Sequence, residues 1–257
     1  MIERSPLVDA HCHPGENLAE ELPRAAAAGV RAIVLAAARA EEFAAVRALG
    51  EVPVGEESVA IFPAFGVHPW YAATGPENLE ELLDRAIERT NGALLGEIGL
   101  DFARPKEEHA LQLTVFRRQL TYAARRRLGL VIHSVRAAEE TIALVREFSP
   151  WPVLLFHAVS CSADIIRRLA EMGGYFSFSA RMLSPRRKKA RAAAAAVPSD
   201  RLLLESDWPS ADDSPSRIAD ALAPLARLRG ESIERLAEQV WKNSQRFLQA
   251  GFGRNPF

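Results

Sequence analysis

Cysteine is scarce in this sequence. Cys12 and Cys161 are the only two among 257 residues, and they lie far apart in the chain. A disulfide framework and a CxxC metal or redox motif are therefore not expected. A reducing compartment is the default for such a chain.

The sequence also lacks a strong excess of either charge and a long apolar run. Its formal net charge is −1, so any contact with nucleic acid must come from a local basic patch. No apolar stretch approaches the roughly 20 residues that cross a bilayer. The opening segment "MIERSPLVDAHCH" runs into a candidate strand and leaves no room for a signal peptide. We expect a cytoplasmic protein that does not bind membranes, and no obligate protein partner is evident.

Short apolar, strand-forming runs alternate with helical stretches along the whole chain. This alternation predicts a parallel sheet covered by helices, and eight such units in about 250 residues predict a single (β/α)8 TIM barrel. Even spacing and the absence of a Gly/Ser linker indicate one domain over residues 1–257, which the amphipathic helix 231–250 closes. The eight runs cover residues 6–11, 30–37, 60–68, 93–100, 129–134, 152–158, 174–180 and 201–207.

Polar side chains stand where these runs end. Catalytic residues of TIM barrels lie at the carboxyl-terminal ends of the strands. Five of the six histidines fall there, together with several carboxylates, whereas His109 lies in a predicted helix. The strand-end set is His11, His13, His68, Glu97, Asp101, His133, His157, Glu205 and Asp207.

The motif "VDAHCH" ends the first run with two histidines one residue apart. Side chains of a strand alternate between its two faces, so His11 and His13 point the same way and Cys12 points the other. Buried imidazoles and carboxylates without a cation between them would carry a large desolvation cost. With histidines and carboxylates from other strands at the same end, the pair indicates a metal site.

Several motifs resemble the TatD-type metal-dependent deoxyribonuclease family of amidohydrolase-like TIM barrels. They are "DAHCH", "GVHP" (66–69), "GEIGLDF" (96–102), "IHS" (132–134), "FHAVS" (156–160), "LLLESDWP" (202–209) and "VWKNSQRF" (240–247). The match extends from about residue 7 to 248, in the family's order.

The resemblance implies a hydrolase with two divalent ions, Mg, Mn or Zn. His11, His13 and Asp207 would hold one ion, His133 and His157 the other, and Glu97 would bridge both. Two ions can activate a shared water, and Asp207 is placed to accept its proton, so Asp207 and Glu97 are the catalytic candidates. Glu205 would either orient a ligand or serve as a buried structural carboxylate, with equal weight.

Positions outside the metal ligands depart from the family. Val135 stands where the family has arginine, and the nearby Arg136 would face differently. Cys161 replaces a glycine after the strand-six histidine, and Trp208 replaces a small residue after Asp207. We expect Cys161 to be a buried hydrophobe, and Trp70 and Trp208 either to stack a base or, slightly favoured, to pack within their loops.

Basic residues near the predicted mouth suggest how an anionic substrate would bind. The segment "ARMLSPRRKKARA" (180–192) predicts a helix capped by Ser184, with Pro185 and the run Arg186–Lys189 in its first turn, where positive charge opposes the helix dipole. A solvated basic face is the alternative. Arg104 would either meet a phosphate or pair with Asp101. We assign substrate contacts to His68, Arg104, Arg181 and Arg186.

Three functions fit the sequence. A phosphodiesterase that acts on DNA, preferably on single-stranded ends, is the leading hypothesis. A two-metal hydrolase of a small ester, amide or lactone is the second, since one fold hosts many substrates. A metal-binding protein without turnover is the third, and Asp207 together with Glu97 argues against it, because a storage site needs no proton acceptor.

Overall fold

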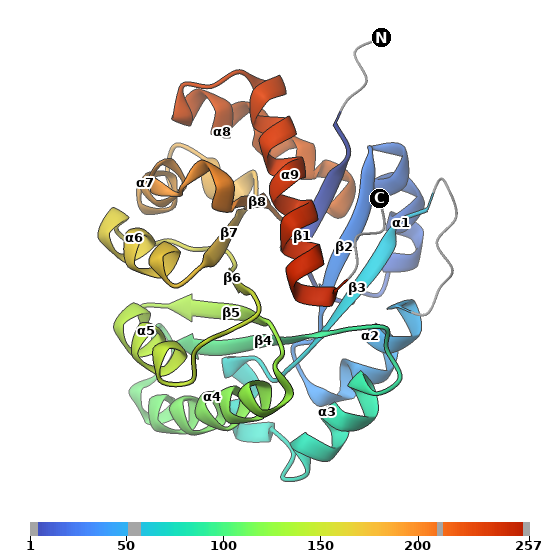
Figure 1. Ribbon diagram of the computed structural model, residues 1–257, viewed down its shortest axis with the longest axis vertical. Coiled ribbons are helices and arrows are strands. Elements are labelled where there is room, and N and C mark those ends of the chain that lie inside the picture. The colour runs from blue at the N-terminus through green and yellow to red at the C-terminus, as the bar shows by residue number, and fades with distance from the viewer. Residues whose placement is uncertain (1–4, 51–57, 210–212, 254–257) are drawn as a thin grey trace.

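A closed barrel of parallel strands forms the centre of the molecule (Figure 1). The computed structural model describes residues 5–50, 58–209 and 213–253. Within them eight strands follow one another around the barrel in chain order, and β8 closes on β1 through Asp9 and Leu204. The TIM-barrel prediction is confirmed. The strands are β1 (Leu7–Cys12), β2 (Val30–Ala36), β3 (Ala60–Phe65), β4 (Leu94–Asp101), β5 (Leu130–Val135), β6 (Leu154–Phe156), β7 (Gly174–Phe178) and β8 (Leu202–Leu204).

Helices surround the barrel and connect its strands (Figure 1). The described residues contain no helix that is long and apolar enough to cross a membrane. That the chain forms one domain stays a prediction. The α-helices are α1 (Leu18–Ala27), α2 (Phe43–Gly50), α3 (Leu79–Ile87), α4 (Lys106–Arg126), α5 (Ala138–Glu147), α6 (Ala163–Glu171), α7 (Lys188–Ala196), α8 (Leu222–Arg229) and α9 (Ile233–Phe252).

The core has two layers because successive strand residues face opposite ways. One layer lies between strands and helices and includes Cys12. The other fills the barrel and includes Val8 and Ala10 of β1. The pairing of β1 with β2 shifts its register between Asp9 and Cys12, so the alternation of faces does not continue unbroken from Ala10 to Cys12. α9 closes this interior from the amino-terminal side, where the Phe252 ring lies 4.7 Å from that of Phe62.

The helix α7 begins later than its sequence predicts. Arg181–Leu183 form a 3-10 turn, and Ser184 ends that turn instead of capping α7. The Arg187 N–H then donates to the Ser184 carbonyl at 3.0 Å, which makes a further turn before the helix starts at Lys188. The predicted cap is therefore wrong, and Arg186 and Arg187 lie before the helix rather than inside its first turn.

Candidate metal centre

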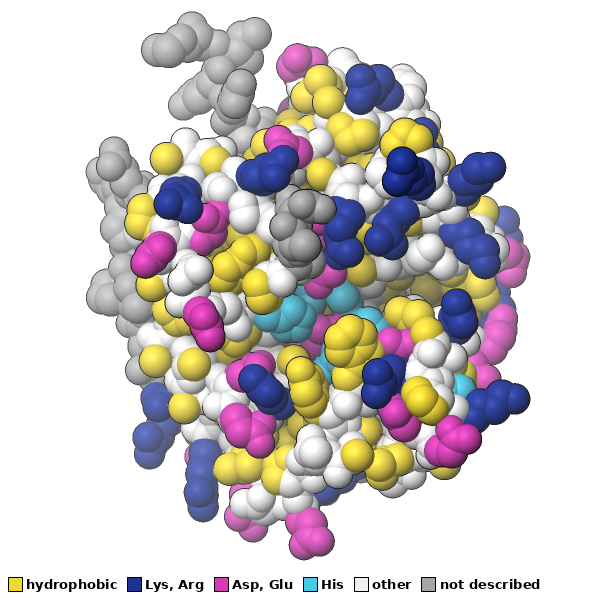
Figure 2. Space-filling view, turned by 180° about the vertical axis from the view of Figure 1, so that it is seen from behind, with side chains coloured by type: hydrophobic (Ala, Val, Ile, Leu, Met, Phe, Trp, Pro, Cys, Tyr) yellow, Lys and Arg dark blue, Asp and Glu magenta, His cyan; other side chains and the backbone are white. Residues whose placement is uncertain are grey.

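Glu97 is the hub of a cluster of histidines at the carboxyl-terminal end of the barrel. It lies in β4 and is only 1% exposed. Five imidazoles reach its carboxylate from four other strands or the residues that follow them. Seen from the side opposite to α9, histidines lie in a hollow of the surface (Figure 2). The histidines are His11, His13, His68, His133 and His157.

The two oxygens of Glu97 divide these histidines into two groups. Oε2 lies 3.0 Å from His13 Nε2 and 3.4 Å from His11 Nε2. Oε1 lies 2.8 Å from His133 Nδ1 and 2.6 Å from His157 Nε2. His68 Nε2 also lies 3.2 Å from Oε1. A carboxylate whose two oxygens face separate groups of imidazoles has the arrangement of a bridge between two cations.

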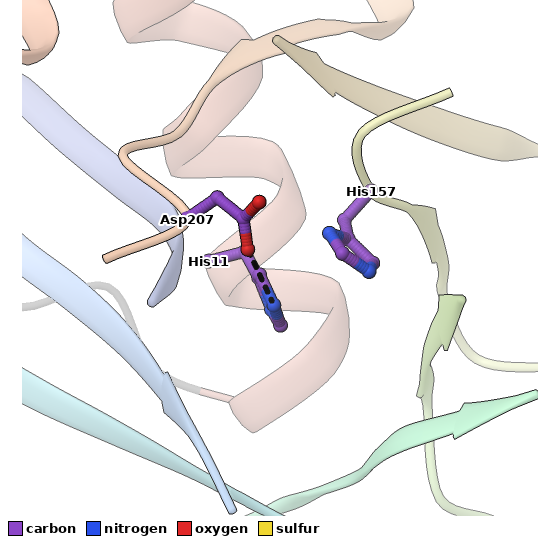
Figure 3. A group of neighbouring side chains, drawn as sticks. All are labelled: His11, His157 and Asp207. Carbon is purple, nitrogen blue, oxygen red and sulfur yellow. Dashed lines mark ion pairs between the residues drawn. The ribbon is translucent and has the colours of Figure 1, made fainter. Parts of the chain in front are cut away.

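Asp207 approaches the cluster from the residues after β8. Its Oδ1 lies 3.9 Å from His11 Nε2, and its side chain is 23% exposed. Figure 3 shows Asp207, His11 and His157 pointing toward one another from separate segments. The Asp207 N–H donates to the His11 carbonyl at 3.0 Å, and its φ of 53° turns the chain away from the strand. Asp207 thus reaches both the histidines and solvent.

The donor atoms of this cluster fit divalent metal ions. The donors fall into three groups of atoms that lie within 4.8 Å of one another: His11, His157 and Asp207; His11, His13 and Glu97; His68, Glu97 and His133. Two pairs of ring nitrogens face each other at 3.2 Å, from His11 to His13 and from His133 to His157. Imidazole and carboxylate are common ligands of zinc and other divalent ions.

The electrostatics of the metal-free cluster are dominated by burial and by the carboxylate. Burial raises the pKa of Glu97, but electrostatic attraction to His157 and His68 and hydrogen bonds from His11 and His13 outweigh it and hold the pKa well below its ordinary value. Burial and the neighbouring His157 keep the pKa of His11 well below 6.5. A buried carboxylate that stays ionised supplies the charge a cation needs.

His13 and His68 both present Nε2 to the same carboxylate, but their Nδ1 atoms have different partners. The Nδ1 of His13 donates to the Ala36 carbonyl at 2.8 Å, so Nε2 is the nitrogen that a metal can bind once it has lost its proton. The Nδ1 of His68 instead accepts the Trp70 N–H at 3.2 Å. Burial lowers the pKa of His68, so the neutral ring carries its proton on Nε2, 3.2 Å from Glu97 Oε1. His68 therefore faces the centre as a hydrogen-bond donor.

Two carboxylates lie behind the metal-facing histidines. Asp101 Oδ2 is 3.6 Å from His133 Nε2, and Glu205 Oε2 is 3.8 Å from His157 Nδ1. Glu205 is fully buried and accepts hydrogen bonds from the Ala158 N–H at 3.0 Å and from Ser177. Carboxylates in this position orient imidazole ligands. Glu205 is thus a buried carboxylate that faces His157 without a hydrogen bond to it, and its role in orienting that ligand stays a prediction.

Asp9 and Asp101 have contacts that sequence reasoning missed. Asp9 is buried in β1, and its Oδ1 accepts the N–H groups of Ser206 at 2.9 Å and His11 at 3.2 Å. Burial raises its pKa to about 7. Its place in β1, two residues before His11, was the available signal. Asp101 pairs with Trp70 and faces His133, not Arg104.

The predicted substrate-binding arginines occupy different places. Arg181 lies at the mouth, with Nη2 3.3 Å from Asp207 Oδ2 and Nε 3.4 Å from Asp213. Arg104 is an exposed residue whose Nε lies 3.1 Å from Glu108, so the alternative pairing with Asp101 is wrong. Arg186 is exposed beside the turn that precedes α7. Their roles in substrate binding stay predictions.

Trp208, Cys161 and Arg136 lie at or next to positions where the sequence departs from the family. The indole of Trp208 lies against the backbone of Gly15, where an added Cβ would come within 2.4 Å of the ring. Burial raises the pKa of the half-buried Cys161 thiol to about 11. Arg136 is exposed just after β5 and has a φ of 54°. The surroundings of Trp208 favour the packing interpretation.

Comparison with known proteins matches this fold and cluster to one family. The family model for TatD-related DNases matches residues 8–249. The chain belongs to this family. The family prediction is confirmed, and the chain is a metal-dependent hydrolase of the TatD type.

Relatives of known sequence or structure support the assignment. The chain is 29% identical to the metal-dependent hydrolase YjjV of Escherichia coli K12, over 92% of this chain and 95% of that protein. It is 28% identical to a 3'-5' ssDNA/RNA exonuclease TatD from Pantoea ananatis, over 88% and 91% respectively. The crystal structure of Escherichia coli YjjV superposes with a TM-score of 0.83 and 27% identity, over 96% of this chain and 98% of that one.

Proposed function

We propose that this hydrolase uses two divalent ions to cleave phosphodiester bonds of DNA, with single-stranded ends as its preferred substrate. The division of the histidines between the two oxygens of Glu97 carries the proposal. That arrangement suits a pair of ions, and paired ions are typical of enzymes that transfer or hydrolyse phosphoryl groups. The relative in Pantoea ananatis is described as an exonuclease on single-stranded DNA and RNA.

The geometry of the cluster supports one division of the ligands. His11, His13 and Asp207 would hold one ion, His133 and His157 the other, and Glu97 would contact both. When bound, such ions supply Lewis acidity that activates water and neutralises charge on phosphoryl oxygens. Mg, Mn and Zn all suit a mixed imidazole and carboxylate set. His68 would contribute an Nε2–H donor rather than a metal bond.

The protein's own groups divide the remaining work. Asp207 is partly exposed and lies at the edge of the cluster, so its carboxylate would accept the proton of the attacking water. The Nε2–H of His68 points into the same space and would hydrogen-bond an oxygen of the scissile phosphate. Arg181 reaches Asp207 from the mouth and would contact phosphate oxygens once substrate enters.

Charge at the mouth favours an extended anionic substrate. Arg186, Arg187, Lys188 and Lys189 are exposed on the segment that follows the loop of Arg181. Figure 2 shows Lys and Arg side chains gathered on one side of the hollow that holds the histidines. A small neutral ester would gain nothing from this charge, whereas a nucleic-acid backbone would.

The experiment is a substrate panel with defined metals. The protein would be stripped of metal, restored separately with Mg, Mn or Zn, and tested on a single-stranded oligonucleotide, its duplex, a small phosphodiester and a lactone. Single-stranded DNA should be cleaved faster than duplex, and Asp207→Asn should control for contaminating nuclease. Hydrolysis of the lactone together with intact DNA under every metal would replace the proposal with the small-substrate hydrolase.

A further inference from the structure

Trp70 is an exposed aromatic residue at the edge of the metal centre. It follows His68 and Pro69 in the 3-10 helix Pro69–Thr74 after β3. The residue is 54% exposed. Among large apolar residues in the described ranges, only Leu111 and Ile233 are also exposed, and they lie on the α-helices α4 and α9. A single exposed apolar residue is ordinary, so its attachments decide whether it has a role.

The indole ring is held in place from two sides. Its only polar atom, Nε1, donates to Asp101 Oδ2 at 2.6 Å. Its centroid lies 5.0 Å from that of His68, with the two rings nearly perpendicular. The backbone N–H of Trp70 also donates to His68 Nδ1. The polar atom is thus occupied, and the surface that remains open to solvent is the apolar part of a fixed ring.

Fixing an exposed aromatic ring removes the entropy cost that a ligand would otherwise meet on binding it. Rigid aromatic side chains are effective contact surfaces for this reason. The other tryptophans do not offer such a surface. Trp208 packs against Gly15, Trp151 donates to the Val145 carbonyl, and Trp241 packs against the layer inside the barrel.

Trp70 lies across the mouth from the basic segment, by which we mean Arg181 and the exposed run Arg186–Lys189. Trp70 follows β3, and Arg181 follows β7. In a closed barrel of eight strands in chain order, β3 and β7 are four strands apart in either direction. A nucleotide chain that crosses the centre would therefore have a base at Trp70 on one side and phosphates at the basic segment on the other.

We propose that Trp70 is a stacking platform for the terminal nucleobase of a single-stranded substrate, an inference that rests on the proposed nuclease function. Every base has an apolar π-face, so a platform of this kind accepts any base and rejects an end that lacks one. Base–aromatic stacking is sequence-tolerant and corresponds to about 5- to 150-fold in binding per base. A duplex end, whose terminal bases are stacked and paired, would use it poorly.

The test compares two oligonucleotides that differ only at the scissile end. One carries a normal terminal base, and the other carries an abasic tetrahydrofuran residue with the same phosphates. Wild-type protein should show a KM about 5- to 150-fold lower for the end with a base. Trp70→Ala should bring the ratio of the two KM values close to one, and Trp70→Phe, which keeps a ring but not the Nε1–H, should retain most of the ratio.

Ile233→Ala is the matched control, since it removes an exposed apolar side chain from α9, at the opposite end of the barrel. It should leave the ratio unchanged. The inference is overturned if Trp70→Ala keeps the wild-type ratio, or if wild-type protein cleaves both oligonucleotides with the same KM. The latter result leaves the nuclease function standing. If neither oligonucleotide is cleaved with any metal, the proposed function itself fails, and the platform with it.

Discussion

At the amino-terminal end of the barrel, Phe62 packs against Phe252 and Tyr175 packs against Phe247, whereas at the carboxyl-terminal end five histidines surround Glu97. The same strands supply both ends. Alternation decides which side chains point inward, and position along the strand decides whether they are apolar or polar. One end is thus built for packing, and the other concentrates buried polar groups that packing alone does not need.

The largest expected effect lies at the polar end. Asp207→Asn keeps an oxygen that can meet a metal but loses the ability to accept a proton. Turnover should fall by about 10²- to 10⁴-fold, the usual cost of losing a general base. Steady-state rates at matched metal content would measure this. A variant with wild-type kcat and bound metal would move the proton acceptor elsewhere, with Glu205 the first residue to test.

A substitution at the apolar end should lower stability and leave turnover unchanged. Phe247→Ala removes a fully buried ring that packs against Tyr175, and its cost should be about 3–5 kcal/mol in the free energy of unfolding. Metal content and kcat per folded molecule should stay at wild-type values. Chemical denaturation and elemental analysis would check both. A loss of bound metal from this variant would show that the two ends are coupled.

Metal counts sharpen the comparison within the polar end. Glu97→Ala should reduce occupancy at both ion positions, since its two carboxylate oxygens face separate groups of histidines. His157→Ala should mainly affect one position. His68→Ala should retain both ions, because its Nε2 carries the proton. Elemental analysis per chain measures all three, and an unchanged count in Glu97→Ala would contradict its bridging position.

Metal affinity should rise with pH. Burial lowers the pKa of His13, but hydrogen bonding to Glu97 and its charge outweigh this and raise the pKa to about 9. Burial also lowers the pKa of His133, but the nearby carboxylates of Asp101 and Glu97 outweigh this and raise the pKa to about 9. Both rings hold a proton at pH 7 that a metal must displace.

If binding a metal ion displaces one proton, its apparent affinity should rise about tenfold per pH unit between pH 7 and pH 9. The combined binding constant for both ions, with two protons displaced, should rise about a hundredfold per pH unit. Above pH 9 the affinity should level off. Calorimetric titrations in buffers with different ionisation enthalpies would count the protons. A pH-independent affinity over this range would show that the rings are already neutral in the metal-free protein.

The sequence predicts which polar residues stand at the ends of the strands better than it predicts the hydrogen bonds between the loops that follow them. Histidines and carboxylates that end apolar runs are local signals, and the closed barrel brings all of them to one place. The hydrogen bond from Trp70 to Asp101 joins the residues after β3 to the end of β4, 31 positions apart, and no local pattern marks it. The proton position on His68 likewise depends on a backbone N–H that only the folded loop places.

The smallest expected effect concerns the basic run beside the mouth. Arg186, Arg187, Lys188 and Lys189 are exposed, and Lys188 and Lys189 begin α7, where positive charge opposes the helix dipole. Replacing all four with glutamine should weaken cleavage of single-stranded DNA and flatten its salt dependence by about 0.7 units of slope for each phosphate that the variant no longer neutralises. Thermal stability should not fall, because the unfavourable interaction of these charges with the helix dipole is removed.

Replacing the remote Arg125, Arg126 and Arg127 at the end of α4 is the matched control, since those side chains lie before β5 at the opposite end of the barrel. A quadruple variant that cleaves at the wild-type rate across a salt titration would make the run a solvated face, and the polar end of the barrel would then bind its substrate without it.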